Sequence, residues 1–93
     1  MEYRKFSREQ RKDVLESTLA NLESQHYARS LDIEKWRAVK ADPLTEAKAE
    51  DTRILNNRDQ EATGQLASAL YDVRKLEIAM EQTQRELDAL GNA

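Results

Sequence analysis

The sequence predicts an all-α protein: an antiparallel, coiled-coil-like hairpin of two long helices, completed to a bundle by oligomerisation. Apolar residues recur at alternating three- and four-residue steps, the spacing that keeps one stripe of a helix facing a partner. Only two glycines and one proline are present to interrupt helices. That proline, Pro43, lies near the middle of the 93 residues, so one connection separates two helical halves.

A first helix is expected over residues 7–40. Ser7 is followed three positions later by Gln10, a capping-box pattern in which each side chain bonds the other's backbone N–H at a helix start. Helical periodicity then continues to about Lys40. The stripe of this helix, mostly apolar, is Leu15, Leu19, Leu22, His26, Arg29, Ile33 and Trp36.

The connection is expected at residues 41–43, Ala-Asp-Pro. A residue before proline is pushed out of helical geometry, which ends the first helix at Asp42. Asp42 can also cap the next helix, with Pro43 at its first position. A second helix is therefore expected from Pro43 to about Leu90, ended by Gly91 in the left-handed conformation that glycine adopts easily.

The second helix carries the longer stripe, which is apolar at every position but one. Its residues are Leu66, Ala69, Val73, Leu76, Met80, Thr83, Leu87 and Leu90. Upstream, residues 56–65 hold Gly64 and one small apolar residue, so a break there would give three helices. Strong helix formers flank this segment and no proline lies inside it, which favours one continuous helix.

So short a connection makes the two helices antiparallel. Folding about Asp42 sets Leu15 opposite Ala69, and this apolar pairing favours the hairpin. The same register leaves Leu87 and Leu90 beyond the reach of the first helix. Four more apolar residues are expected off the main seam: Leu31, Val39, Leu70 and Ile78.

This surplus of apolar surface is the main functional signal. The chain makes one domain, residues 1–93, that is 39% hydrophobic and 35% charged. A domain of this size buries only about 60% of its unfolded surface, and without cysteine no disulfide can stabilise it. We therefore expect a small interaction protein that forms a homo-oligomer, a dimer or higher, or that binds another helical protein. The expected interface residues are Leu66, Leu70, Val73, Leu76, Met80, Leu87, Leu90 and Trp36.

Other functional classes are disfavoured. Mean hydropathy is −0.90, and no stretch reaches the roughly 18 apolar residues of a membrane span. No apolar signal core follows the N-terminus, so a soluble protein of a reducing compartment is expected. The sequence has no thiol, no glycine-rich phosphate loop and no Ser–His–Asp set that a hairpin could assemble. We expect neither enzyme activity nor a cofactor.

The first alternative is nucleic-acid binding through the N-terminal segment, because clustered cations contact phosphates. The basic residues there are Arg4, Lys5, Arg8, Arg11 and Lys12. An isoelectric point near 5.2 disfavours general nucleic-acid coating. Pairing with the acidic C-terminal segment explains the cluster equally well. The acids of that segment are Glu77, Glu81, Glu86 and Asp88.

The second alternative is a ferritin-like di-metal bundle. Glu23 and His26 form a Glu-x-x-His pair on one helical face, a spacing that lets a carboxylate and an imidazole converge on one ion. Glu61 comes about level with His26 if the register slips slightly. The chain has one histidine, so a two-fold dimer is needed to double the ligand set. A polar seam residue explains His26 more simply.

Two further features have structural interpretations. Trp36 is expected to close the hairpin by packing on Leu44 and Ala47, although tryptophan is also enriched at binding hot spots. The pair Asn56 and Asn57 is a candidate polar layer that fixes the register, as buried asparagine does in coiled coils.

The opening third of the chain contains the segments Tyr3-Arg4-Lys5-Phe6-Ser7, Glu9-Gln10-Arg11, Leu15-Glu16, Leu19, Leu22-Glu23 and His26-Tyr27. It resembles small helical-hairpin proteins encoded by tailed phages of actinobacteria. The resemblance implies a phage or prophage origin, an accessory or virion-associated role, and a location in the cytoplasm of a bacterial host or in the virion. Residues 54–61 and the Glu-x-x-His pair are also similar to encapsulated ferritins, whose two-helix subunits use that motif. Gly64 stands where a metal-binding histidine would be wanted.

Overall fold

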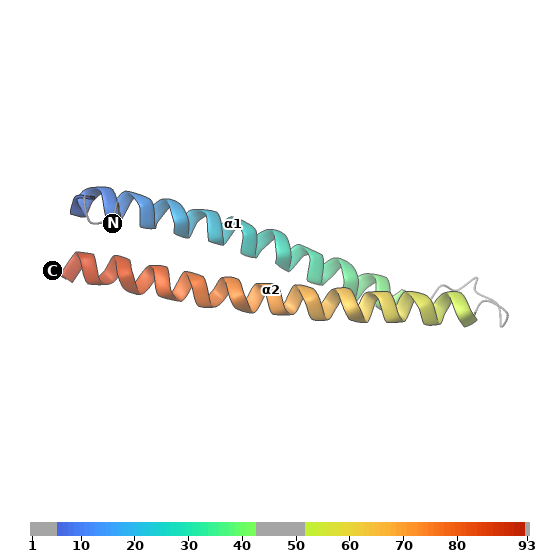
Figure 1. The fold of residues 1–93 in the computed structure, drawn as a ribbon. Helices are drawn as coiled ribbons and strands as arrows, with labels where there is room; N and C mark the ends of the chain where they lie inside the picture. The colour runs from blue at the N-terminus through green and yellow to red at the C-terminus, as the bar shows by residue number, and fades with distance from the viewer. Residues whose placement is uncertain (1–5, 43–51, 93) are drawn as a thin grey trace. The chain divides into compact units, whose positions relative to one another are not determined.

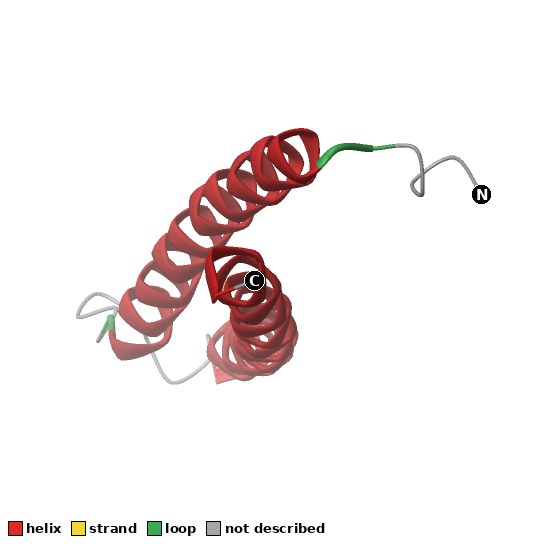
Figure 2. Ribbon diagram, turned by 90° about the vertical axis from the view of Figure 1, so that its left-hand side faces the viewer, coloured by secondary structure: helices red, strands yellow, loops and turns green. Residues whose placement is uncertain are grey.

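The computed structural model describes residues 6–42 and 52–92, and nearly all of them lie in two α-helices (Figure 1). Helix α1 spans Arg8–Ala41 and helix α2 spans Thr52–Asn92. The described residues contain no strand, and Figure 2 shows only helix and loop. The prediction of an all-α, two-helix hairpin is confirmed.

The chain divides into two compact units, each built from a stretch of both helices. Unit 1 combines Met1–Tyr27 with Arg74–Ala93, and unit 2 is Ala28–Val73. Within each unit the helices run antiparallel, because a residue further along α1 contacts a residue less far along α2. The contacts are Arg8 with Leu90 and His26 with Glu77 in unit 1, and Arg29 with Asp72 and Lys40 with Thr63 in unit 2.

The start of α1 has the capping box expected from the sequence. The backbone N–H of Ser7 donates to Gln10 Oε1 at 2.8 Å, and the N–H of Gln10 donates to Ser7 Oγ at 3.1 Å. These two bonds satisfy backbone donors that have no partner inside the helix. Helix α1 ends at Ala41, one residue from its expected end. The expected start of the second helix at Pro43 lies outside the described residues.

Helix α2 is continuous through the polar segment 56–65, as predicted. Gly64 lies inside the helix, and a Cβ added there would meet nothing within 4 Å. The expected left-handed cap at Gly91 is wrong, because the helix continues through Gly91 to Asn92. Gly91 therefore has ordinary helical geometry, which glycine adopts as readily as the left-handed form.

The predicted stripes form the seam between the helices, and every stripe residue is buried or half-buried. The α2 stripe also extends upstream through Leu55, Asp59 and Ala62 at the same spacing. The seam is thin, because no large side chain is fully buried in the described residues. The buried residues are Ile33, Ala62, Ala69 and Thr83.

The expected register is wrong. Leu15 was expected opposite Ala69, but it lines a pocket with Glu86, 17 positions (86 − 69) further along α2. That shift is close to five of the three- and four-residue steps of the stripe. A shift by whole steps leaves apolar residues opposite apolar residues, so the stripe alone cannot distinguish the two registers. The polar residues do distinguish them. Folding about Asp42 puts Arg29 opposite Leu55, whereas the observed register puts it against Asp72.

The corrected register changes several expectations. Asn56 and Asn57 are exposed and do not form a polar layer in the seam. Leu87 and Leu90 lie within reach of α1 after all, since Arg8 contacts Leu90. Val39, expected off the seam, is half-buried. The other three residues expected off the seam are exposed, namely Leu31, Leu70 and Ile78.

Candidate interaction surface

The seam of unit 2 contains a polar cluster centred on Arg29. Its Nε donates to Asp72 Oδ2 at 2.9 Å, and its guanidinium also reaches Asp32 Oδ2 at 2.8 Å and Ser68 Oγ at 3.3 Å. The Arg29 side chain is 26% exposed, so solvent weakens these ion pairs only in part. The cluster ties α1 to α2 at one position along the seam.

Hydrogen bonding to Asp32 is the main cause that raises the pKa of Arg29 above its usual value, and bonding to Asp72 adds to it, while desolvation opposes both. Arginine is protonated at any physiological pH even without this effect. The cluster therefore retains its cation at any physiological pH.

Arg58 of α2 bonds the C-terminal end of α1. One amino group donates to the carbonyl of Asp42 at 2.7 Å, and the other donates to the carbonyl of Lys40 at 3.3 Å. The last carbonyls of a helix lack intrahelical partners, and a cation there also interacts favourably with the helix dipole. The amino group that donates to Lys40 also donates to Asp59 Oδ1 at 3.1 Å, and Arg58 Nε donates to the same oxygen at 3.3 Å.

Arg58 and the acceptors of Arg29 were not predicted from the sequence. A signal was present, because the α2 stripe continues upstream at three- and four-residue steps through Ala62, Asp59 and Leu55. Following that spacing identifies Asp59 as a seam residue and Arg58 as its neighbour at the edge of the seam. Asp72 and Ser68 could be paired with Arg29 only once the register was known.

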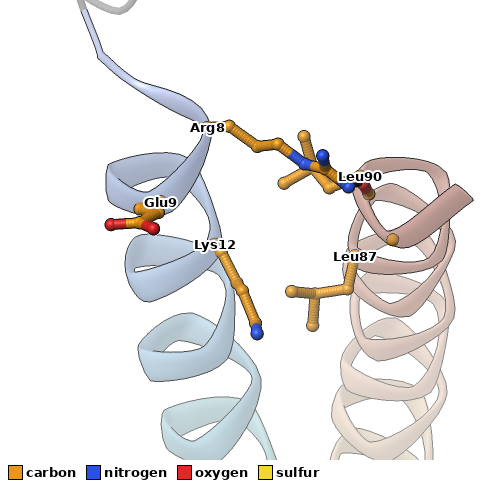
Figure 3. A pocket seen from close by; sticks show the side chains of 6 residues that line it. Arg8, Glu9, Lys12, Leu87 and Leu90 are labelled. Atoms are coloured by element: carbon orange, nitrogen blue, oxygen red, sulfur yellow. Dashed lines mark hydrogen bonds between the residues drawn. The ribbon is translucent and has the colours of Figure 1, made fainter. Parts of the chain in front are cut away.

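Unit 1 contains a similar contact, in which an arginine donates to a carbonyl near a helix C-terminus. Arg8 of α1 donates to the carbonyl of Leu90 in the last turns of α2, and α2 has no basic residue of its own in its last turn. Figure 3 shows the Arg8 side chain reaching across to Leu90, with Lys12 directed toward α2 near Leu87. Arg8 therefore supplies the cation that favours a helix C-terminus.

The space around these side chains forms a pocket of about 260 Å³ (Figure 3). Arg8 and Lys12 continue the α1 stripe toward its N-terminus, so two cations face Leu87 and Leu90 where an apolar seam would have apolar residues. A leucine side chain is buried less completely against long charged side chains than against another leucine. In this pocket the α1 residues that line the space beside Leu87 and Leu90 are all charged, namely Arg8, Glu9 and Lys12.

A second pocket, of about 220 Å³, lies beside the first turns of α1. Its lining is mainly apolar, with one residue of each charge at the edge. The lining residues are Phe6, Arg11, Val14, Leu15 and Glu86. Val14 is 51% exposed and Phe6 is 43% exposed, so this side of unit 1 presents apolar surface to solvent.

Of the basic residues proposed for nucleic acid, Arg4 and Lys5 lie outside the described residues. The other three are all exposed. Arg8 bonds Leu90, Lys12 lies 3.8 Å from Glu16, and Arg11 lines a pocket with Glu86. The expected pairing with the C-terminal acids is not what the structure shows in the described residues, because Glu77 and Glu81 pair with Arg74.

The metal-ligand candidates do not converge. His26 Nε2 lies 3.5 Å from Glu77 Oε2 in unit 1. Glu61 belongs to unit 2, two residues before the Thr63 that accepts a bond from Lys40, so it is not level with His26. Glu23 is exposed. In residues 6–42 and 52–92 no three His, Cys, Asp or Glu side chains are grouped closely enough to hold a metal ion.

The expected interface residues fall into two sets. Leu66, Val73, Leu76 and Met80, with Leu87 and Leu90, are half-buried in the seam. Leu70 is 47% exposed on the outside of unit 2.

Trp36 is half-buried, and Lys35 Nζ lies 4.8 Å from the centre of its ring. The register places Trp36 between Arg29 and Lys40, and therefore level with Leu66. Its expected contacts with Leu44 and Ala47 lie outside the described residues.

Comparison with protein-family models, curated proteins and solved structures finds no match to this chain. Neither described helix has a stretch apolar enough to cross a membrane. The functional inference therefore rests on the seam, the two pockets and the distribution of charge.

Proposed function

We propose that this chain is a non-enzymatic helical-hairpin protein that works by self-association, with a second copy completing its core. One observation supports this most directly: the buried apolar residues of the described chain are one isoleucine and two alanines. The stripe leucines are only half-buried. Full burial of a leucine side chain contributes about 1.5–3 kcal/mol, and the paired helices leave much of that contribution unrealised.

The exposed apolar residues support the same proposal. Unit 1 exposes Val14 and Ile78, and unit 2 exposes Ile54 and Leu70, each by more than 40%. Scattered apolar residues on a surface are normal, but here they accompany a core too thin for a chain of this length. Association of hairpins into a helical bundle covers such surface with the same side-chain packing that forms the seam.

The test is the molar mass in solution, measured by sedimentation equilibrium over a micromolar concentration series. We expect a dimer or larger species for the wild-type chain. Leu76→Asp places an unpaired carboxylate in the seam, so it should dissociate the assembly and unfold the helices together. Ser24→Asp, which adds the same charge at an exposed position of α1, should change neither. A wild-type chain that is monomeric and cooperatively folded throughout the series contradicts the proposal.

A further inference from the structure

The two sides of the helix pair in unit 1 differ strongly in charge. Helix positions three, four and seven residues apart share a face, so the residues that flank the seam separate into two sides. One side is acidic, and its residues include Glu9, Asp13, Glu16, Glu77, Glu81 and Asp88. Arg74 lies on the same side and pairs with Glu77 at 3.7 Å and Glu81 at 3.9 Å. If two copies packed through their acidic sides, most of the charges that meet would be carboxylates on both molecules.

The opposite side carries few charges, and we call it the charge-poor face. It consists of residues 11, 14, 18, 21 and 25 of α1 and residues 75, 79, 82, 86 and 89 of α2. Small or uncharged side chains occupy most of these positions, among them Thr18, Asn21, Ala79, Gln82 and Ala89. The 220 Å³ pocket lies on this face, with the exposed Val14 at its edge.

Two opposite charges stand at the same level of the charge-poor face, one on each helix. Arg11 of α1 and Glu86 of α2 line the pocket together. Both side chains are exposed, and they form no ion pair with each other or with another residue in the described parts of the chain. Each is therefore available to a charge of opposite sign on a second molecule.

We propose that two copies of this chain pack through their charge-poor faces, with α1 of each copy lying against α2 of the other. A two-fold axis parallel to the helices produces this arrangement. It keeps both copies at the same level, so each Arg11 meets the Glu86 of the other copy, and the contact is made twice. The exposed Val14 side chains become covered in the same interface. This inference rests on the proposed self-association and names its surface and orientation.

Charge reversal tests the contact between Arg11 and Glu86. Arg11→Glu sets two pairs of like charges against each other and should weaken dimerisation about tenfold at low salt, with a smaller effect at high salt. The double variant Arg11→Glu/Glu86→Arg restores the opposite pairing and should return the dimer Kd to within about twofold of wild type. Both changes put acid near a helix start and base near a helix end, which favours the helices, so the variants should fold.

Asp13→Arg is the matched control, because it reverses one charge on the acidic side of the same helix. We expect it to leave the dimer Kd within about twofold of wild type. If Arg11→Glu and Asp13→Arg weaken dimerisation equally, the charge-poor face is not the interface.

Disulfide cross-linking tests the orientation independently, since the chain has no cysteine of its own. Val14→Cys and Gln82→Cys lie on α1 and α2 of the charge-poor face. Because Arg11 is level with Glu86, Val14 is about level with residue 83 (11 + 86 − 14), next to Gln82. A mixture of the two variants should form the mixed disulfide on mild oxidation. A mixture of Glu16→Cys and Glu81→Cys, on the acidic side, should not.

The outcomes separate this inference from the proposed function. A monomeric wild-type chain overturns both. A wild-type dimer whose Kd does not respond to Arg11→Glu, and whose Val14→Cys and Gln82→Cys mixture does not cross-link, overturns the interface and leaves self-association standing.

Discussion

At the scale of single residues, three arginines in the described parts of the chain make side-chain bonds that join the two helices. Arg29 binds two carboxylates and a hydroxyl, whereas Arg8 and Arg58 bind carbonyls near the end of the opposite helix. A guanidinium offers five donors in a planar fork, so one side chain can satisfy several acceptors on two elements. The polar contacts thus set which residues lie opposite one another.

Replacing Arg58 should destabilise the end of α1. Arg58→Ala removes the donors to the carbonyls of Lys40 and Asp42, and we expect a loss of about 1–2 kcal/mol in the free energy of unfolding, measured by urea titration. Arg58→Lys should recover only part of this free energy, because a lysine ammonium cannot donate to both carbonyls at once in the way that a planar guanidinium does. Arg53→Ala, at an exposed position of the same helix, is the control. An equal loss in both alanine variants would show that the carbonyl bonds contribute little.

The Arg29–Asp72 pair should contribute more than an exposed ion pair. A double-mutant cycle with Arg29→Ala and Asp72→Ala is expected to give a measurable favourable coupling energy that decreases with salt. The comparison cycle uses Arg74 and Glu81, which lie 3.9 Å apart with both side chains more than half exposed. Its coupling should be close to zero. Equal couplings in the two cycles would contradict a special role for Arg29 in the seam.

At the scale of whole elements, each helix is determined mainly by its own sequence. The capping box begins α1, the absence of internal proline keeps α2 continuous, and the seven-residue repeat defines the seam stripe of each helix. Gly64 is the weakest position of α2, because glycine loses more backbone entropy in a helix than any other residue.

Gly64→Ala should therefore stabilise the protein. An added Cβ meets nothing within 4 Å, so the substitution has no steric cost, and we expect an increase of about 0.5–1 kcal/mol in the free energy of unfolding. Ala67→Gly, one turn away at another exposed position, should lower the free energy of unfolding by a similar amount. Denaturant titration followed by helical circular dichroism checks both. A destabilised Gly64→Ala would indicate that a neighbouring chain occupies the space beside residue 64.

At the scale of the whole molecule, stability and association are expected to be linked. The described chain buries no large side chain completely, so the energy that a partner adds is a large part of the total. The temperature midpoint of unfolding should then rise with protein concentration, because mass action favours the associated, folded state.

This dependence can be measured by scanning calorimetry over a hundredfold range of concentration. Arg11→Glu should lower the midpoint most at the dilute end of the range, while Asp13→Arg should follow the wild-type curve. A midpoint that is independent of concentration would mean that each hairpin is stable alone.

Some of the candidate surface could be predicted from the sequence. The stripe from Leu66 to Leu90 identified the seam of α2, because periodicity needs no knowledge of the partner helix. The capping box at Ser7 was likewise a local signal. The pairings of Arg29, Arg58 and Arg8 were not predictable, since each depends on what the antiparallel neighbour places opposite. The metal candidate Glu61 failed for the same reason, because it assumed a register that the structure does not have.

By itself, the amino-acid sequence determined that this protein consists of two helices with a continuous seam stripe on each. Those properties depend on residues within a few turns of one another, so they can be read along one chain. The tertiary structure alone decided the register, the carbonyls bonded by Arg8 and Arg58, and the division of unit 1 into an acidic side and a charge-poor face. A seven-residue repeat allows several registers with nearly equal apolar burial, and only the meeting of polar groups across the seam selects one of them.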